Sequence, residues 1–409
     1  MNISELRGKK VLIVGMGIEG KATLRYLRHH IPDSTVTPVD QTDGADYLDN
    51  QREYDIAIKS PSVKKELLRI PYTTATNIFF ANTRGMTIGV TGTKGKSTTA
   101  SLIFAILQAA GKRAHLVGNI GNPMLLELLS EQGPKDIYVC ELSSYQLEDI
   151  AYSPHIAVMV SFFPEHMDHH GSVDAYWEAK KRIALFLKQE DYLVYNPAFR
   201  QLAELAAQTV AHAVPYVETL PCGEKEVPLL GKHNRDNVRA AATVGEILEI
   251  PRDTAAAAIR SFRPLPHRIE CVGTYKDIRF YDDAISTTPE SAIVAIVALE
   301  NVGTIFLGGQ DRGYDFSELV SLIDRSPIKN IVFFPDSGEN IETLLKEKSS
   351  KRYRTLRTKD MREAVQFAFD TTTPGAICLL STASPSYSVW KNFEEKGTLF
   401  ATYVKELGQ

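Results

Sequence analysis

Short apolar runs rich in Val, Ile and Phe alternate along the chain with longer stretches of helical periodicity. Such alternation is typical of βαβ units, whose parallel strands are buried on both faces. Strands are expected at 11–14, 36–40, 56–59, 86–90, 137–142, 156–162, 279–282, 304–307, 330–334 and 376–380. Helices are expected at about 20–30, from a glycine-containing loop at 92–98 to about 110, and at about 174–188. The pattern therefore predicts the α/β class.

Two positions divide this pattern into three parts. A new strand, glycine loop and helix begin near residue 86, and the segment 262–266 (F-R-P-L-P) contains two prolines that suit a hinge. We expect three consecutive α/β domains at 1–86, 87–264 and 265–409. The first is expected to be Rossmann-like, the second like a P-loop ATPase, and the third Rossmann-like again.

Composition narrows the class of protein. The hydrophobic share of 44% and the charged share of 23% are those of a soluble globular protein. The net charge of -4 and the lack of a basic stripe argue against a nucleic-acid partner. The four cysteines are widely separated, which favours buried reduced thiols over zinc or disulfides. The polar start and the absence of a stretch of ~18–20 apolar residues predict a cytoplasmic protein without membrane insertion.

The first glycine loop lies at 15–20 (G-M-G-I-E-G), between a strand and a helix. Gly15, Gly17 and Gly20 would let the backbone approach a phosphate, and Asp40, at the end of the next strand, can reach a hydroxyl-bearing ring. Alone, the pattern favours NAD over another nucleotide, with a purely structural turn as the other possibility. A second nucleotide loop in the same chain favours a nucleotide-sugar substrate here.

That second loop reads Gly92-Thr93-Lys94-Gly95-Lys96-Ser97-Thr98 and also lies between a strand and a helix. Val90 stands where the general P-loop has glycine, but the Gly-Lys-Ser core is kept. Backbone N–H groups can cradle phosphates, Lys96 can pair with the β and γ oxygens, and Ser97 or Thr98 can bind magnesium. The alternative is a glycine-rich turn with accidental lysines.

The second loop resembles the G-T-x-G-K-[ST]-T loop of the Mur ligases and the folylpolyglutamate synthases. Further segments resemble Mur ligase motifs along nearly the whole chain: 118–121 (G-N-I-G), 141–146 (E-L-S-S-Y-Q), 165–168 (E-H-M-D), 179–183 (A-K-K-R-I), 231–237 (G-K-H-N-R-D-N), 265–270 (L-P-H-R-I-E) and 391–397 (K-N-F-E-E-K-G). The folylpolyglutamate synthases lack the domain that carries the first loop. The length and the 391–397 segment resemble the glutamate-adding Mur ligases most.

The resemblance implies an enzyme of peptidoglycan precursor synthesis, which uses ATP to join glutamate to UDP-N-acetylmuramoyl-L-alanine through an acyl phosphate. A monomer is expected. The catalytic residues implied are Lys96, Glu141, His166 and Lys180. The ATP-binding residues implied are Gly92 to Thr98 with Asn234, Asn237, His267, Arg268 and Asp283. Two Mg²⁺ ions are expected, and their implied ligands are Ser97, Thr98, Glu141, His166 and a carbamylated Lys180. The substrate-binding residues implied are Gly15, Gly17, Gly20, Asp40, Asn119, Ser143, Thr287, Arg312, Ser386 and Phe393.

Several of these assignments have a simpler alternative. Lys180 could be a solvated lysine on a surface helix, which is the usual place of lysine. His267 and Arg268 could be a domain-packing pair, and Asp282 could exchange roles with Asp283. His169 and His170 are expected to be loop residues.

The sequence departs from the D-glutamate enzymes where the amino acid is bound. Segment 282–287 reads D-D-A-I-S-T, so Ile285 replaces the lysine of N-D-S-K-[AS]-T, and Arg312 stands where lysine is common. Elsewhere, Glu165 replaces an aspartate and Lys396 an arginine. D-glutamate is favoured on prevalence, with L-glutamate open because a related group of ligases adds it to the same nucleotide. Alternatives of other classes are an NAD-dependent dehydrogenase and a catalytically silent sensor of wall precursors.

Overall fold

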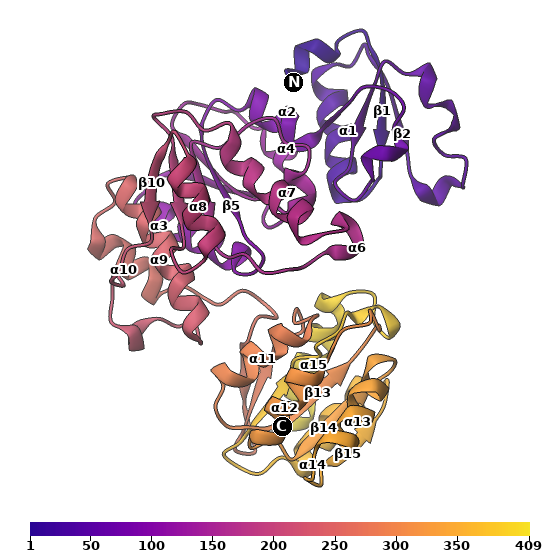
Figure 1. Ribbon diagram of the computed structural model, residues 1–409, viewed down its shortest axis with the longest axis vertical. Helices are drawn as coiled ribbons and strands as arrows, with labels where there is room; N and C mark the ends of the chain where they lie inside the picture. The colour runs from indigo at the N-terminus through magenta and orange to yellow at the C-terminus, as the bar shows by residue number, and fades with distance from the viewer. The chain divides into compact units, whose positions relative to one another are not determined.

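The computed structural model describes residues 1–409, apart from the side chain of Asp168. It contains three sheets separated by helices, and the predicted α/β class is confirmed. The chain forms two compact units: Met1–Val227 with His233–Phe262, and Pro228–Lys232 with Arg263–Gln409 (Figure 1). The first unit holds two of the sheets and the second unit holds the third. Among the described residues, no helix combines the length and apolar character needed to cross a membrane.

The N-terminal sheet is parallel, with strand order β2-β1-β3-β4. Its strands are β1 (Lys10–Val14), β2 (Thr35–Val39), β3 (Ile56–Lys59) and β4 (Tyr72–Thr74), and its helices are α1 (Ile18–His30) and α2 (Ala75–Asn82). The central strand β1 is buried from Val11 onward, as expected of a strand covered on both faces. Thr74 ends β4 and caps α2 by accepting the amide of Asn77 at 3.1 Å.

The central sheet has six parallel strands in the order β10-β9-β8-β5-β7-β6. Its strands are β5 (Met86–Thr91), β6 (Arg113–Gly118), β7 (Asp136–Glu141), β8 (Ile156–Met159), β9 (Tyr192–Tyr195) and β10 (His212–Pro215). Its helices are α3 (Lys96–Ala109), α4 (Met124–Glu127), α5 (Ser144–Leu147), α6 (Met167–His170), α7 (Val173–Leu185), α8 (Arg200–Gln208), α9 (Lys232–Ile247) and α10 (Arg252–Arg260). The carboxyl ends of β5, β7 and β8 are adjacent, which is where open α/β sheets bind ligands.

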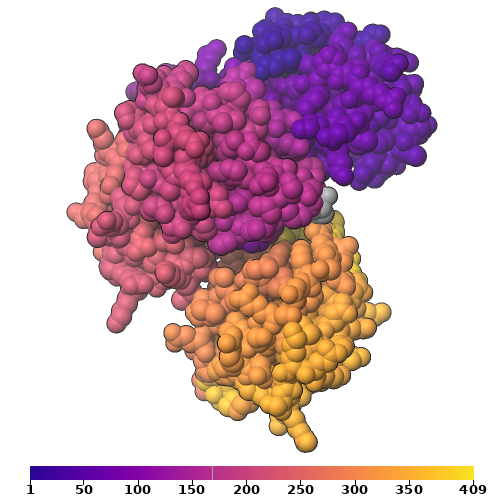
Figure 2. Space-filling model, in the orientation of Figure 1, coloured from indigo at the N-terminus to yellow at the C-terminus, as the bar shows by residue number. Residues whose placement is uncertain are grey.

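The third sheet has the order β11-β12-β16-β13-β14-β15 and is parallel except for β11. Its strands are β11 (Glu270–Tyr275), β12 (Ile278–Asp282), β13 (Val302–Gly308), β14 (Asn330–Phe334), β15 (Arg354–Arg357) and β16 (Ile377–Leu380). Its helices are α11 (Pro289–Ala298), α12 (Ser317–Arg325), α13 (Ser337–Lys348), α14 (Met361–Thr371) and α15 (Phe393–Gly408). One face packs against α11, α12 and α13, and the other against α14 and α15. These residues, orange to yellow in Figure 2, form a closely packed body.

The cysteines are all free thiols, and one of them differs from expectation. Cys140, Cys222 and Cys378 are buried, as predicted, whereas Cys271 is exposed. The reason is topological: Cys271 lies on β11, the edge strand of the third sheet, whose side chains are only partly covered.

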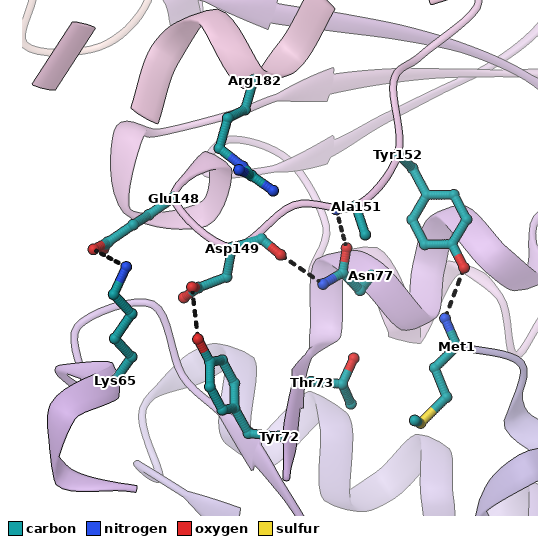
Figure 3. Close-up of a pocket in the computed structure, with 10 residues that line it drawn as sticks. All are labelled: Met1, Lys65, Tyr72, Thr73, Asn77, Glu148, Asp149, Ala151, Tyr152 and Arg182. Atoms are coloured by element: carbon teal, nitrogen blue, oxygen red, sulfur yellow. Dashed lines mark hydrogen bonds and ion pairs between the residues drawn. The ribbon is translucent and has the colours of Figure 1, made fainter. Parts of the chain in front are cut away.

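Within the first unit, charged and polar contacts join the N-terminal sheet to the segment that follows α5 (Figure 3). The Asp149 carboxylate accepts the hydroxyl of Tyr72 at 2.9 Å and forms an ion pair with buried Lys59 at 3.0 Å. The Asn77 amide donates to the carbonyl of Asp149 and accepts the amide of Ala151. A polar cavity of about 450 Å³ lies among these groups. Since its carboxylates pair with Lys59 and Lys65, and its arginine, Arg182, donates to the Ile150 carbonyl, we interpret this region as a structural contact between the N-terminal sheet and the residues after α5.

Candidate active site

The second glycine loop depends on a glycine that no other residue could replace without strain. Gly95 has φ +87° and caps α3, and a Cβ atom there would lie 2.4 Å from Oδ1 of Asn237. The same Oδ1 accepts the hydroxyl of Thr99 at 3.2 Å, and the Asn237 amide donates to Asn234 at 2.9 Å. The structure therefore places Asn237 against the glycine loop, and Asn234 is connected to the loop through Asn237.

The segment after β8 holds the other side of this loop. Ser161 Oγ accepts the amide of Lys94 at 2.9 Å, and the ammonium of Lys94 forms an ion pair with Glu165 at 2.6 Å. Glu165 thus fills the place of the usual aspartate and neutralises a loop lysine. Thr93 donates its hydroxyl to the Phe163 carbonyl, and Lys96 donates to the Thr93 carbonyl at 2.9 Å.

A buried carboxylate lies beside the loop, at the end of β7. Glu141 is 1% exposed, and its Oε2 has no hydrogen-bond partner among the described residues. The side chain of Asn119 donates to the other oxygen at 3.5 Å. A shielded carboxylate oxygen without a donor is costly, so this atom fits a cation ligand. Ser97 and Thr98, at the start of α3, carry hydroxyl oxygens, which are also ligands of the kind that Mg²⁺ prefers.

Lys180 on α7 points inward from its helix. It is 1% exposed, its Nζ donates to the Gly92 carbonyl at 2.8 Å, and it lies 4.7 Å from the centre of the Tyr176 ring. The alternative of a solvated surface lysine is therefore wrong. Burial, reinforced by the charge of Lys96, holds the pKa of Lys180 well below its usual range. The residue thus favours the neutral amine, the form that can add to carbon dioxide as a nucleophile.

His166 is close enough to Glu165, Lys96 and Lys180 for their charges to act on its imidazole. Its backbone is left-handed, with φ 61°, and it forms the N-cap of α6. Its Nδ1 lies 3.4 Å from the hydroxyl of Tyr145, and its Nε2 lies 3.7 Å from Glu165. Burial lowers the pKa of His166, which favours the neutral imidazole that binds metal ions.

His169 and His170 lie on α6 itself, so their assignment to a loop is wrong. A hydrogen bond joins His169 to Glu148 at 3.1 Å, and another joins His170 to Ser144 at 3.0 Å. The two side chains thereby tie α6 to the α5 region and help to position His166 at the start of α6.

The first glycine loop is equally tight, because a Cβ on Gly20 would lie 2.0 Å from the carbonyl oxygen of Gly15. Asp40 accepts the amide of Met16 at 2.6 Å and that of Thr42 at 3.1 Å. These bonds lower the pKa of Asp40 and hold the end of β2 on the loop. The Asp40 carboxylate therefore stabilises the first glycine loop through its hydrogen bond to Met16, independently of any ligand.

Ser143 accepts the amide of Gln146 at 3.3 Å and caps α5. The side chain of Gln146 then donates to Glu19, inside the first glycine loop, at 3.2 Å. Because Oε1 of Glu19 is shielded and has no partner among the described residues, burial raises the pKa of Glu19 to about 7. Glu19 thus links the first glycine loop to α5 of the central sheet.

The Glu19→Gln variant is expected to change how stability depends on pH. Because folding raises the pKa of Glu19, its protonated carboxyl group stabilises the folded protein. This stabilisation is fully present below the pKa of the unfolded chain, about 4.3, and is lost as the pH rises through about 7. Glutamine keeps the hydrogen bond but cannot ionise. The variant should therefore exceed the wild type by about 1–3 kcal/mol near pH 8, with little gain near pH 5, in urea denaturation. Equal differences at both pH values, or the same response from exposed Glu66→Gln, would contradict this.

In the second unit, the candidate amino-acid-binding residues follow neighbouring strands. Thr287 follows β12 and is half-buried, Arg312 follows β13 and is exposed, and Ser386 follows β16 and is 2% exposed. Phe393 is the first residue of α15, and its ring lies 6.1 Å from that of His267. Since β12, β16 and β13 are adjacent, their carboxyl-end loops lie at one edge of the sheet.

The two acids at the end of β12 are bound within the second unit. Asp282 pairs with Nδ1 of His267 at 2.7 Å. Asp283 accepts the Ser381 hydroxyl at 2.7 Å and the Ile269 amide at 3.3 Å, and burial raises its pKa to about 7. Because both acids have such partners, contacts of His267 and Asp283 with ATP stay predictions. Arg268, next to His267, is half-buried.

Lys396, which stands at the usual arginine of the 391–397 segment, is fully buried in the second unit. Its Nζ donates to the Thr382 hydroxyl at 2.5 Å. Burial lowers the pKa of Lys396 to about 7, while the charges of Asp282 and Asp283 oppose that shift. The Lys396 side chain therefore stabilises the loop after β16 through its hydrogen bond to Thr382.

The sequence patterns do not identify Glu19 and Gln310 as site residues, although each has a shielded side-chain oxygen, of a carboxyl group in Glu19 and of an amide in Gln310, without a partner among the described residues. Gln310 follows directly on the Gly308-Gly309 pair that ends β13. A polar residue just past a buried parallel strand is a signal that could have identified it.

Comparison with known proteins places this geometry in a family. The Mur ligase middle domain matches residues 90–221. The chain is 34% identical to UDP-N-acetylmuramoyl-L-alanine--L-glutamate ligase of Salinispora tropica and 29% identical to UDP-N-acetylmuramoylalanine--D-glutamate ligase of Streptococcus thermophilus, with 99% of both chains covered in each case. The fold resembles that of MurF ligase from Thermotoga maritima in complex with ADP, with TM-score 0.66, 15% identity and coverage of 99% and 97%.

These relatives are ligases, so the comparisons give no support to a dehydrogenase. Identity of 34% over nearly the full length of both chains also accounts for the motifs in all three parts of the sequence. The chain belongs to the Mur ligase family, whose members are ATP-dependent enzymes that form amide bonds.

Proposed function

We propose that this enzyme joins glutamate to UDP-N-acetylmuramoyl-L-alanine, with cleavage of ATP to ADP and phosphate, in the synthesis of peptidoglycan precursors. The observation that carries the proposal is the group of Lys96, Glu141, His166 and Lys180 around one glycine loop. The relatives that add glutamate to this nucleotide support the choice of both substrates. A monomer in the cytoplasm is part of the proposal.

The proposed reaction has two steps. The alanine carboxylate of the nucleotide first attacks the γ-phosphorus of ATP, which gives an acyl phosphate and releases ADP. The amine of glutamate then attacks the acyl carbon, and phosphate leaves. Both steps depend on alignment and charge neutralisation rather than on a protein nucleophile. Lys96 and the N–H groups at the start of α3 would bind the phosphate oxygens.

Glu141, with Ser97 or Thr98, is proposed to hold one Mg²⁺, and His166 with a carbamylated Lys180 a second. Magnesium supplies positive charge to the phosphate oxygens in such sites. The shielded Oε2 of Glu141 supports the first site. For the second, burial favours the neutral amine of Lys180, and addition of carbon dioxide would convert it to an anionic oxygen ligand.

L-glutamate is the amino acid that the observations favour. Prevalence is the only argument for D-glutamate. Ile285 replaces the lysine found in the D-glutamate enzymes, and the relative at 34% identity is named for L-glutamate, whereas that at 29% is named for D-glutamate. Arg312 offers a planar fork that can bind a carboxylate through two hydrogen bonds.

The test is release of phosphate from ATP by the purified full-length enzyme. UDP-N-acetylmuramoyl-L-alanine and magnesium are supplied with either L- or D-glutamate. We expect turnover that requires both the nucleotide and the amino acid, with L-glutamate preferred. Turnover with D-glutamate alone would overturn the stereochemical proposal, and folded enzyme without turnover on either would overturn the function.

A further inference from the structure

Three loops of the second unit meet at the carboxyl edge of its sheet. The loops after β13 and β16 approach so closely that a Cβ on Gly309 would lie 2.2 Å from the carbonyl oxygen of Pro385. That carbonyl also accepts the amide of Gln310 at 2.8 Å. The loop after β12 is tied to the same region, because Thr382 donates its hydroxyl to the Ser286 carbonyl at 3.4 Å. The backbone of this edge is therefore fixed.

Three side-chain atoms on this edge are shielded from solvent and have no hydrogen-bond partner among the described residues. One is Oγ of Ser286, on the loop after β12; the other two, on the loops after β16 and β13, are Oγ of Ser386, a residue 2% exposed, and Oε1 of Gln310. The backbone beside Ser386 and Gln310 is held, because the amide of Gln310 bonds the carbonyl of Pro385, the residue before Ser386. A shielded polar atom without a partner costs free energy in the unbound protein, and a ligand that supplies the missing hydrogen bond recovers it.

The chemistry of the Ser386 and Gln310 atoms differs, and this difference indicates what they bind. A hydroxyl can donate to a carboxylate, whereas the carbonyl oxygen of an amide only accepts. An acceptor oxygen repels phosphates and carboxylates and selects a donor. On glutamate the only strong donor is the amino group. A Ser386 hydroxyl and a Gln310 carbonyl on joined loops therefore match the two kinds of group on one amino acid.

We propose that the side-chain carbonyl of Gln310 binds the amine of the incoming glutamate, while Ser386 binds one of its carboxylates. This assignment rests on the proposed function and adds Gln310 to the residues that bind the amino acid. By accepting one N–H, Gln310 turns the lone pair of the neutral amine toward the acyl carbon. The nitrogen then bonds to that carbon, the C–O bond to phosphate breaks, and phosphate leaves with the electron pair and takes up the surplus proton of the amine.

The test compares two variants of similar size in the full-length enzyme. Gln310→Met removes the acceptor and keeps the volume, whereas Gln310→Glu keeps an acceptor oxygen. We expect Gln310→Met to lower kcat/KM for glutamate by about 10- to 100-fold, as for loss of a hydrogen bond to a group that is charged in the transition state, because the amine nitrogen gains positive charge as the C–N bond forms. We expect Gln310→Glu to stay within about threefold of the wild type. Gln366→Met is the matched control, because Gln366 is an exposed residue of α14 whose amide bonds only Asp370.

A partial reaction separates binding of the amine from general damage. Hydroxylamine can trap the acyl phosphate formed from the nucleotide and ATP without glutamate. We expect its product to form at the wild-type rate in Gln310→Met. Loss of this reaction too, or equal loss of glutamate addition in Gln310→Glu and Gln310→Met, would overturn the assignment. If the wild type itself forms neither product, the proposed function has failed instead.

Discussion

Replacement of Lys180 by alanine is expected to reduce ligase turnover by about 100- to 1,000-fold, as for loss of one preorganised charge-stabilising group. Lys180 is 1% exposed and lies against the glycine loop, with Nζ 2.8 Å from the Gly92 carbonyl. Burial, reinforced by the charge of Lys96, lowers the pKa of Lys180 and so favours the neutral amine over an ammonium that would repel a metal ion. Steady-state phosphate release, with thermal unfolding as the check on folding, measures the effect.

Lys181→Ala is the matched control, because Lys181 is the next residue on the same helix and forms only a partly exposed ion pair with Glu178. We expect its turnover to be within about twofold of the wild type. Removal of carbon dioxide from the buffer should lower wild-type turnover, and added bicarbonate should restore it. Turnover of Lys180→Ala close to that of Lys181→Ala would show that no metal ligand stands at this position.

The fold could be predicted where strands are buried on both faces. The apolar run at 330–334 coincides with β14, and the strand predicted at 56–59 coincides with β3, each buried throughout. Five of the strands without a prediction, β4, β6, β10, β11 and β15, are at sheet edges. The exception is β9, a four-residue interior strand that is buried only at its two central residues. β6, β10 and β15 are largely exposed or half-buried. An edge strand needs no continuous apolar run, because it is covered on fewer sides, and the three-residue β4 is too short to show any period.

The candidate site could be predicted in its residues but not in its hydrogen bonds. The second glycine loop follows the buried strand β5, and Glu141 is the last residue of the buried strand β7. The carboxyl ends of such strands are where open α/β sheets bind ligands, so these residues can be predicted from their position in the sequence. By contrast, the shielded oxygens of Glu19 and Gln310 result from packing between segments that are distant in the sequence. The support that Asp40 gives to a loop depends equally on its partners. Whether a polar atom finds a partner is decided in three dimensions, so no local pattern reveals it.

Replacement of Lys59 by methionine is expected to destabilise the first unit by about 3–5 kcal/mol, because it leaves a largely buried carboxylate without its counter-charge. Lys59 is 1% exposed and reaches both Asp149, at 3.0 Å, and the Val63 carbonyl, at 2.9 Å. Asp149 keeps only the hydroxyl of Tyr72. The shift in the urea midpoint of the first unfolding transition measures this effect.

The controls for Lys59 separate loss of an ion pair from the burial of an unpaired charge. Arg200→Met removes an exposed pair with Glu204, and we expect a change of no more than about 0.5 kcal/mol. The double variant Lys59→Met/Asp149→Leu removes both charges, so it should be more stable than Lys59→Met alone. A double variant that is less stable than Lys59→Met would mean that the packing of the two side chains, and not their charge, joins the N-terminal sheet to the residues after α5.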